Sequence, residues 1–266
     1  MSGEGQSPMP TSMDGQIALV TGAGHGLGQA IVASLARAGC RVYGTDLNPQ
    51  ELIHTGRIIS EAGGFFEGHA FDIRDSQSWE TWVRSVYDRE QAIHILVNDA
   101  GGVAGQVHHP VEAVEDADFD VVVKINLYGT FYGVRAVAPI MKRQRYGRII
   151  NISSGAGRSH SLTGIQAYTS AKAGQIGLTR QMAFELGPYN ITVNNVAPGF
   201  VISNPATRRQ WEAMGEDGQK ALVASVPLRR LGEPEDIAAM VQFFASPAAG
   251  YVTGQVISVD GGMAMF

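Results

Sequence analysis

A tyrosine and a lysine lie four residues apart in the segment Tyr168-Thr169-Ser170-Ala171-Lys172. In a helix, this spacing places the two side chains on the same face. A free phenol has a pKa of about 10, which is too high for efficient acid–base catalysis at neutral pH. A neighbouring ammonium group favours the phenolate, so we predict that Lys172 lowers the pKa of Tyr168. The pair suits a proton transfer, although the same spacing is common on solvated amphipathic helices.

Two hydroxyl groups precede this pair in the sequence. Ser153 and Ser154 end a candidate strand, and Ser154 comes fourteen residues before Tyr168. The hydroxyls could meet a substrate oxygen there, or they could simply belong to a turn.

A glycine-rich segment follows the first candidate strand and leads directly into a helix. It reads Thr21-Gly22-Ala23-Gly24-His25-Gly26-Leu27-Gly28. Glycines permit a tight turn and close backbone approach, while free N–H groups at the start of a helix attract a pyrophosphate. Such a loop alone is weak evidence, but here strand, loop, helix and next strand are all present. We therefore predict a dinucleotide cradle, with His25 an uncharged loop residue.

Acidic residues end the next two candidate strands. Asp46, eighteen residues beyond Gly28, is placed to accept hydrogen bonds from ribose hydroxyls and to repel a 2′-phosphate. No arginine follows it, so NAD(H) is preferred over NADP(H). The alternative role for Asp46 is to cap the next helix, for which Asn48 is the better candidate. Asp72 could accept a hydrogen bond from adenine or start a turn.

Short apolar runs alternate with longer amphipathic segments along the chain. We expect strands at residues 17–21, 41–46, 64–71, 93–98, 148–153, 192–197 and 256–259. We expect helices at about residues 27–38, 49–61, 76–90, 118–143, 165–186 and 234–245. This alternation predicts a doubly wound α/β fold, a parallel sheet with helices on both faces. A ligand would bind beyond the carboxyl ends of the strands.

Composition limits the other possibilities. The 266 residues are 44% hydrophobic, which fits one globular domain at residues 15–266 behind a flexible tail at residues 1–14. A net charge of -5 without a basic run argues against nucleic-acid binding. Cys40 is the only cysteine, and no apolar run is long enough for a signal peptide or membrane span. We expect a cytoplasmic protein. His108 and His109 lack a third ligand at a useful spacing, so we expect no metal site.

Several separated motifs occur in the order that is typical of one family. They are the glycine loop, Asn98-Asp99-Ala100-Gly101, Asn126, the serine pair, Tyr168 with Lys172, Pro198-Gly199 and Val259-Asp260-Gly261-Gly262. Over essentially its whole length after residue 14, the chain resembles a short-chain dehydrogenase/reductase. The resemblance implies a Rossmann-like sheet of seven strands, a homotetramer, and hydride transfer between NAD(H) and a secondary alcohol or ketone without a metal.

The resemblance also implies a role for each catalytic residue. Tyr168 would exchange the proton with the substrate oxygen, and Ser154 would hold that oxygen. Lys172 would contact the nicotinamide ribose and lower the tyrosine pKa, while Asn126 would hold a water that links Lys172 to solvent. The predicted cofactor contacts are Gly22, His25, Gly26, Leu27, Gly28, Asp46, Leu47, Asp72, Ile73, Asn98, Ala100, Gly101, Tyr168, Lys172, Pro198, Gly199, Val201 and Ser203.

Three features depart from the family pattern. Asp99 stands where a second asparagine is usual, and an ionised carboxylate accepts but cannot donate hydrogen bonds. The serine-to-tyrosine interval is one residue longer than usual, so Ser153 competes with Ser154, our preferred residue. Ser203 replaces a threonine that contacts the nicotinamide carboxamide and offers an equivalent hydroxyl.

The substrate is decided elsewhere. Residues 203–230, with Trp211 and Met214, are placed to form a lid over the nicotinamide. Open alternatives are a 3-oxoacyl carrier-protein reductase-like enzyme, a sugar, polyol, hydroxysteroid or aromatic alcohol dehydrogenase, and a non-catalytic NAD-sensing protein. The apolar C-terminal residues Met263, Met265 and Phe266 could pack on another subunit or on the chain's own surface.

Overall fold

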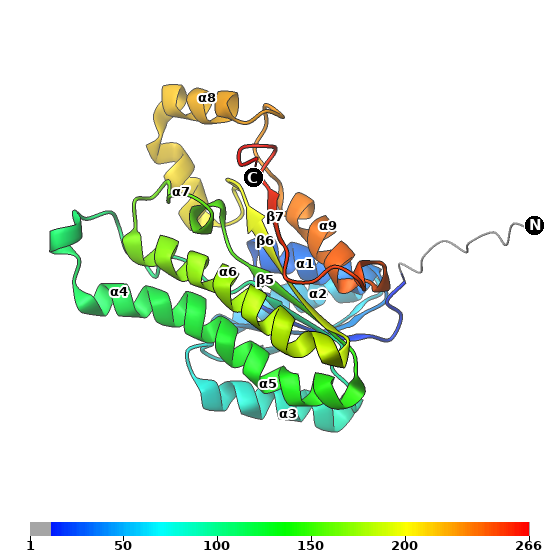
Figure 1. Cartoon of the computed structure of the whole chain (residues 1–266). Helices are drawn as coiled ribbons and strands as arrows, with labels where there is room; N and C mark the ends of the chain where they lie inside the picture. The colour runs from blue at the N-terminus through cyan, green and yellow to red at the C-terminus, as the bar shows by residue number, and fades with distance from the viewer. Residues whose placement is uncertain (1–11, 266) are drawn as a thin grey trace, which may run out of the picture.

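The fold is built on a single parallel sheet whose strand order reverses near its middle. The computed structural model describes residues 12–265. Its strands are β1 (Ile17–Thr21), β2 (Arg41–Asp46), β3 (Phe65–Ala70), β4 (Ile95–Asn98), β5 (Gly147–Ile152), β6 (Ile191–Pro198) and β7 (Val256–Val259). They form one seven-stranded sheet in the order β3-β2-β1-β4-β5-β6-β7 (Figure 1). The order reverses between β1 and β4, so the ligand site is expected at the carboxyl ends of these strands.

Helices cover both faces of the sheet, as predicted. On one face lie α1 (Gly26–Arg37), α2 (Pro49–Glu61) and α9 (Pro234–Ala245), and on the other α3 (Ser76–Glu90), α5 (Gly129–Gln144) and α6 (Gln166–Leu186) (Figure 1). The strands supply both hydrophobic layers because successive side chains point to opposite faces. In β1, Ala18 and Val20 join the first layer, while Ile17 and Leu19 join the second.

The helix predicted at residues 118–143 contains an interruption at a functional position. It consists of α4 (Asp116–Val123), a π-helical turn (Lys124–Tyr128) and α5. Such turns are rare and concentrate at functional sites. Here the turn contains Asn126, whose side chain donates to the carbonyl oxygen of Val122 at 2.8 Å.

Most predicted bounds agree with the structure to within two residues, and the largest omission is the lid. Residues 203–230 contain two helices, α7 (Pro205–Ala213) and α8 (Gly215–Ser225), beyond the carboxyl ends of the strands (Figure 1). Neither helix has a buried residue, so hydrophobic periodicity could not reveal them. The available signal was the start of α7, where Asn204 and Thr207 form a capping box before Pro205.

The last residues of the predicted tail belong to the folded domain. Met13 is 1% exposed and belongs to the core. Its backbone N–H donates to the carbonyl oxygen of Ala38 at 3.0 Å. Residues 1–11 of the tail and Phe266 lie outside the described residues, so those predictions stay untested.

Within residues 12–265, no helix is long and apolar enough to cross a membrane.

Candidate active site

The four predicted catalytic residues come from three elements that meet beyond β5. Tyr168 and Lys172 lie in the first two turns of α6, Ser154 follows β5, and Asn126 lies in the π-helical turn. Lys172 is 3% exposed and Asn126 is fully buried. The structure therefore brings together residues that are 46 positions apart in the sequence.

Ser154, and not Ser153, faces the tyrosine. The hydroxyl of Ser154 forms a hydrogen bond with the phenol of Tyr168, and it accepts the backbone N–H of Ala156 at 3.1 Å. Ser153 turns the other way and donates to the amide oxygen of Asn195 in β6. The geometry supports Ser154 as the residue that would hold the substrate oxygen, while Ser153 joins two strands.

Lys172 is held at the end of β5. Its ammonium donates to the carbonyl oxygen of Ile152 at 2.8 Å and lies 5.7 Å from the centroid of the Tyr168 ring. Burial lowers the pKa of Lys172 to about 8, although the Asp99 carboxylate opposes that shift. The ammonium of Lys172 can thus donate hydrogen bonds close to the phenol, and it can lose its proton at mildly alkaline pH.

The predicted lowering of the tyrosine pKa by Lys172 is wrong for this structure. Burial raises the pKa of Tyr168 above its ordinary value, and the negative charge of Asp99 raises it further. The hydrogen bond from Ser154 acts in the opposite direction without overcoming burial. The sequence argument counted the neighbouring ammonium but not the cost of removing a phenolate from water.

Asn126 braces the turn that lies against Lys172. Its amide nitrogen donates to the carbonyl oxygen of Gly102 at 2.7 Å, and its amide oxygen accepts the N–H of Gly102 at 3.0 Å. A methyl group at Gly101 would lie 2.5 Å from the Asn126 amide oxygen and 3.2 Å from the Lys172 nitrogen. Glycine is required at position 101 for this close approach, and the water-holding role of Asn126 stays a prediction.

The glycine loop has the form that a pyrophosphate requires. Gly22 and Gly26 have φ values of +69° and +58°, in the region that favours glycine. A methyl group at Gly28 would lie 1.9 Å from the carbonyl oxygen of Gly22. The side chain of His25 makes no capping bond at the start of α1, which leaves this helix end suited to a phosphate. The cradle fits a dinucleotide.

Two carboxylates, rather than one, lie at the far end of this loop. Asp46 accepts the N–H of Gly24 at 3.1 Å, while Asn48 caps α2. A ring nitrogen of His25 lies 3.7 Å from a carboxylate oxygen of Glu51. Oxygen or nitrogen atoms of His25, Asp46 and Glu51 lie within 4.8 Å of one another. Sequence reasoning missed Glu51, and its signal was an acidic residue in the first turn of the helix after Asp46.

Three other predicted cofactor residues differ in their burial and in their contacts. Asp72 is paired with Arg74, whose guanidinium lies as close as 2.5 Å and holds the pKa of the carboxyl below its usual value. Ile73 is buried, and its carbonyl oxygen accepts the indole N–H of Trp79 at 3.0 Å. Leu47 is 69% exposed. Sequence reasoning did not predict the Asp72–Arg74 pair, and the adenine contact of Asp72 stays a prediction.

The Asn98–Gly101 segment connects the two halves of the site. The side chain of Asn98 donates to the amide oxygen of Asn151 at 2.9 Å and so ties β4 to β5. The hydroxyl of Thr21 accepts the backbone N–H groups of Asp99 and Ala100, both at 3.0 Å. This turn is therefore fixed to the end of β1, directly before the glycine loop.

The segment after β6 lies against the glycine loop. Gly199 donates its N–H to the carbonyl oxygen of Val259 at 3.0 Å, directly after Pro198. Val201 is 5% exposed. A methyl group at Gly26 would lie 2.6 Å from the backbone oxygen of Ser203. The start of the lid thus packs on the glycine loop, and the cofactor contacts of this segment stay predictions.

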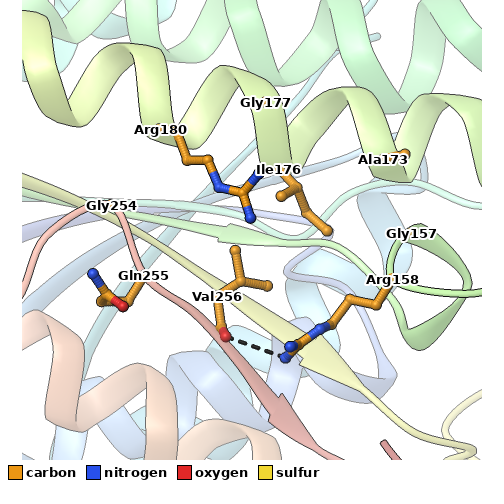
Figure 2. Close-up of a pocket in the computed structure, with 9 residues that line it drawn as sticks. All are labelled: Gly157, Arg158, Ala173, Ile176, Gly177, Arg180, Gly254, Gln255 and Val256. Atoms are coloured by element: carbon orange, nitrogen blue, oxygen red, sulfur yellow. Dashed lines mark hydrogen bonds between the residues drawn. The ribbon is translucent and has the colours of Figure 1, made fainter. Parts of the chain in front are cut away.

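A separate hollow of about 780 Å³ lies between α6 and β7 (Figure 2). Arg158 and Arg180 extend into it, and Arg158 donates to the carbonyl oxygen of Val256 at 3.2 Å and to the Ser258 hydroxyl at 2.8 Å. One of its α6 residues, Gly177, lies nine positions after Tyr168 and therefore on the opposite face of the helix. None of the predicted site residues lines this hollow, so it is not the catalytic cleft.

Comparisons with known proteins agree with this geometry. A family model described as enoyl-(acyl carrier protein) reductase matches residues 22–264. The 3-oxoacyl-(acyl-carrier-protein) reductase FabG of Vibrio harveyi is 36% identical, with 96% of this chain and 99% of that protein covered. The crystal structure of a levodione reductase is 30% identical, with a TM-score of 0.87 over 96% of this chain and 98% of that one. A 7α-hydroxysteroid dehydrogenase complexed with NADH and 7-oxo glycochenodeoxycholic acid is 33% identical, with a TM-score of 0.87 over 95% of each chain.

Proposed function

Because this chain belongs to the short-chain dehydrogenase/reductase family of oxidoreductases, we propose that it interconverts a secondary alcohol and a ketone with NAD(H). The observation that carries the proposal is the hydrogen bond between Ser154 and Tyr168 beside the buried ammonium of Lys172. A bound nicotinamide would accept or supply the hydride. The chain's own residues position the substrate oxygen and move its proton.

In the oxidation direction, the phenolate oxygen of Tyr168 takes the proton of the alcohol hydroxyl. Ser154 donates a hydrogen bond to the same substrate oxygen and holds it as its C–H bond breaks. The alcohol loses one hydride and one proton, so a ketone forms. In reduction the neutral phenol returns the proton, which fits the raised pKa of Tyr168. Such placed proton transfers contribute factors of about 10² to 10⁴ in rate.

Lys172 and Asn126 have supporting roles in this proposal. The ammonium of Lys172 would donate to the nicotinamide ribose and compensate the phenolate charge. Its pKa of about 8 lets it gain or lose a proton near neutral pH. Asn126 would keep the Gly101–Gly102 turn in place beside it and hold the water that exchanges the proton with solvent.

The preference for NAD(H) rests on the charges around the adenosine end of the cradle. Asp46 and Glu51 place two carboxylates beside the glycine loop, and His25 already faces Glu51. Like charges at close range disfavour a 2′-phosphate, while ribose hydroxyls can donate to the same oxygens. Glu51 strengthens an argument that sequence reasoning rested on Asp46 alone.

A second candidate is reduction of 3-oxoacyl thioesters on a carrier protein. The similarity to the FabG reductase of Vibrio harveyi favours this reaction. The Tyr168 chemistry would be unchanged, since a 3-oxo group is also a ketone. The candidates differ in the substrate and in the cofactor that the adenosine end admits.

One experiment separates these functions. The purified protein receives NAD⁺ or NADP⁺ with a panel of secondary alcohols, and NADH or NADPH with ketones and a 3-oxoacyl thioester. The absorbance of reduced nicotinamide reports turnover. We expect kcat/KM with NAD(H) to exceed that with NADP(H) at least about tenfold, equivalent to about 1.4 kcal/mol. Faster NADPH-dependent reduction of the thioester would establish the second candidate. Tight NAD binding without turnover would indicate a sensing protein.

We also propose a homotetramer in the cytoplasm. Strand β7 is a sheet edge, and the large apolar side chains of Phe184, Tyr251 and Met265 are 84%, 103% and 77% exposed in the single chain. Exposed apolar groups and an open edge are typical of surfaces that another subunit covers. A mass measurement in solution tests the assembly, and a monomeric mass would contradict it.

A further inference from the structure

The carboxyl group of Asp99 lies beneath the phosphate cradle. One of its oxygens would be 3.0 Å from a methyl group placed at either Gly22 or Gly28. The N–H of Gly28, at the start of α1, forms a hydrogen bond with this carboxylate. The partly buried side chain therefore packs against the glycines that hold the pyrophosphate in the proposed function.

The surroundings of Asp99 contain more negative than positive charge. From β2, Asp46 raises the pKa of the Asp99 carboxyl, and from α6 the ammonium of Lys172 lowers it. Tyr168, also on α6, is affected in turn, because the Asp99 charge raises its pKa. On the loop itself, the nearest titratable group is His25, whose ring faces Glu51. Burial dominates these influences and raises the pKa of Asp99 to about 7.

A pyrophosphate brings two further negative charges to this cradle. A carboxylate beneath it would repel them in a medium that screens charge less than water does. A protonated carboxyl group removes the repulsion and gains an O–H that can donate. The neutral form of Asp99 is thus the form compatible with a bound dinucleotide.

We propose that Asp99 is a proton-binding site that is coupled to the dinucleotide, so that binding of the cofactor draws one proton from solution onto this carboxyl. The inference rests on the proposed function, because it assigns the glycine loop to a pyrophosphate. The step has a simple balance. The Asp99 carboxylate, one proton and one dinucleotide give the complex with a neutral carboxyl, and no bond in the cofactor changes.

This coupling has a consequence for the catalytic tyrosine. The ionised Asp99 opposes formation of the Tyr168 phenolate. Protonation of Asp99 on cofactor binding removes that opposition, so the general base becomes easier to ionise once the dinucleotide is present. Asp99 acts through charge at a distance and is a positioning residue for the proton, not a catalytic residue.

The affinity for the dinucleotide should depend on pH, because Asp99 is neutral in the complex and can be ionised in the free protein. Below the Asp99 pKa of the free protein, the carboxyl is already neutral and binding takes up no proton. Above it, each complex must take up a proton, so dinucleotide affinity falls by up to about tenfold per pH unit. The fall continues until the pKa of Asp99 in the complex is reached.

The test is calorimetric titration of the full chain with NADH in two buffers of different ionisation enthalpy, about one pH unit above the pKa of Asp99. We expect an uptake that approaches one proton per site and a weakening of about tenfold per pH unit. Asp99→Asn, a neutral isostere that mimics the protonated acid, should abolish both. Asp88→Asn, the same substitution at an exposed carboxylate on α3 outside the cradle, is the matched control and should retain both.

The outcomes distinguish this inference from the proposed function. NADH that binds without proton uptake by the unaltered protein overturns the inference and leaves the proposed function standing. Equal uptake by Asp99→Asn, or its loss in Asp88→Asn, also overturns it. If neither NADH nor NADPH binds, both proposals fail. The first result needs only the unaltered chain. The inference can therefore be overturned even if the Asp99→Asn variant does not fold.

Discussion

The side chains of Asn126 and Lys172 are buried, whereas neither helix of the lid above them, α7 or α8, contains a buried residue. The catalytic residues lie at the ends of packed strands and helices, and hydrogen bonds to backbone atoms fix their positions. The lid is held at its two ends, where Ser203 lies against Gly26 and the backbone N–H of Leu228 donates to the carbonyl oxygen of Gly261 at 3.1 Å. The contrast indicates that the reaction depends on the buried residues around Lys172. Substrate choice depends on the lid, whose helices have no buried residue and can accept substitutions more readily.

Replacement of Tyr168, beside the buried ammonium of Lys172, should have the largest effect on the reaction. Tyr168→Phe keeps the ring and its packing but removes the group that moves the proton. We expect kcat to fall by about 10² to 10⁴ with little change in thermal stability. Steady-state kinetics and a melting curve check the two parts. A variant with near-normal turnover would show that another group transfers the proton.

The serine pair offers a matched test within two adjacent residues. Ser154→Ala should lower kcat by about 10² and move the rising limb of alcohol oxidation to higher pH, because its hydrogen bond lowers the Tyr168 pKa. Ser153→Ala should leave that limb in place, because its hydroxyl binds Asn195 instead. pH profiles of kcat/KM for both variants decide the assignment. An unmoved limb in Ser154→Ala would contradict it.

The raised pKa of Tyr168 also predicts how the two reaction directions respond to pH. The phenol is protonated at neutral pH, so ketone reduction at saturating NADH should be nearly constant there. Alcohol oxidation needs the phenolate and should rise about tenfold per pH unit over the same range. Initial rates in both directions measure this difference. A flat oxidation profile near neutral pH would mean that the phenolate forms more easily than burial allows.

The acidic pair at the adenosine end should control the cofactor. Asp46→Asn removes one charge and should narrow the preference for NAD(H) over NADP(H) by about tenfold, or 1.4 kcal/mol. Glu51→Gln should have a smaller effect in the same direction, since His25 already faces that carboxylate. Dissociation constants for both dinucleotides provide the readout. An unchanged ratio in both variants would locate cofactor choice elsewhere.

The lid should show the smallest effects on the chemistry. Asn204→Ala removes the capping box of α7, at a local cost of about 1 kcal/mol. We expect KM for the substrate to rise several-fold while kcat and the melting temperature change little. Kinetics with one substrate and a melting curve test this. A large fall in kcat would show that the lid takes part in the reaction itself.

The sheet and the catalytic residues could be predicted from the sequence on different grounds, the sheet from local pattern and most of the catalytic residues from the order of motifs. Strands such as residues 17–21 are short apolar runs with clear ends, so their bounds followed from the sequence pattern. Tyr168 and Lys172 could be paired because helix spacing is local. Their partners Ser154 and Asn126 could be assigned only through motif order, since nothing local brings distant residues together.

Other features depended on tertiary surroundings that no pattern contains. The sequence argument reversed the direction of the Tyr168 pKa shift, because burial was unknown. The contact between Glu51 and His25, and the pairing of Asp72 with Arg74, depend on how loops fold. The helices of the lid lack a buried face, so their hydrophobic pattern was weak.

The most direct test of the central claim follows the hydride itself. A secondary alcohol that the panel identifies as a substrate is labelled with deuterium on its carbinol carbon and incubated with NAD⁺ and the protein. Mass spectrometry then examines the reduced cofactor. The account predicts NADH that carries the deuterium with the unaltered chain, and almost none with Tyr168→Phe. Ketone formation without deuterium in the cofactor, or equal labelling by Tyr168→Phe, would contradict it.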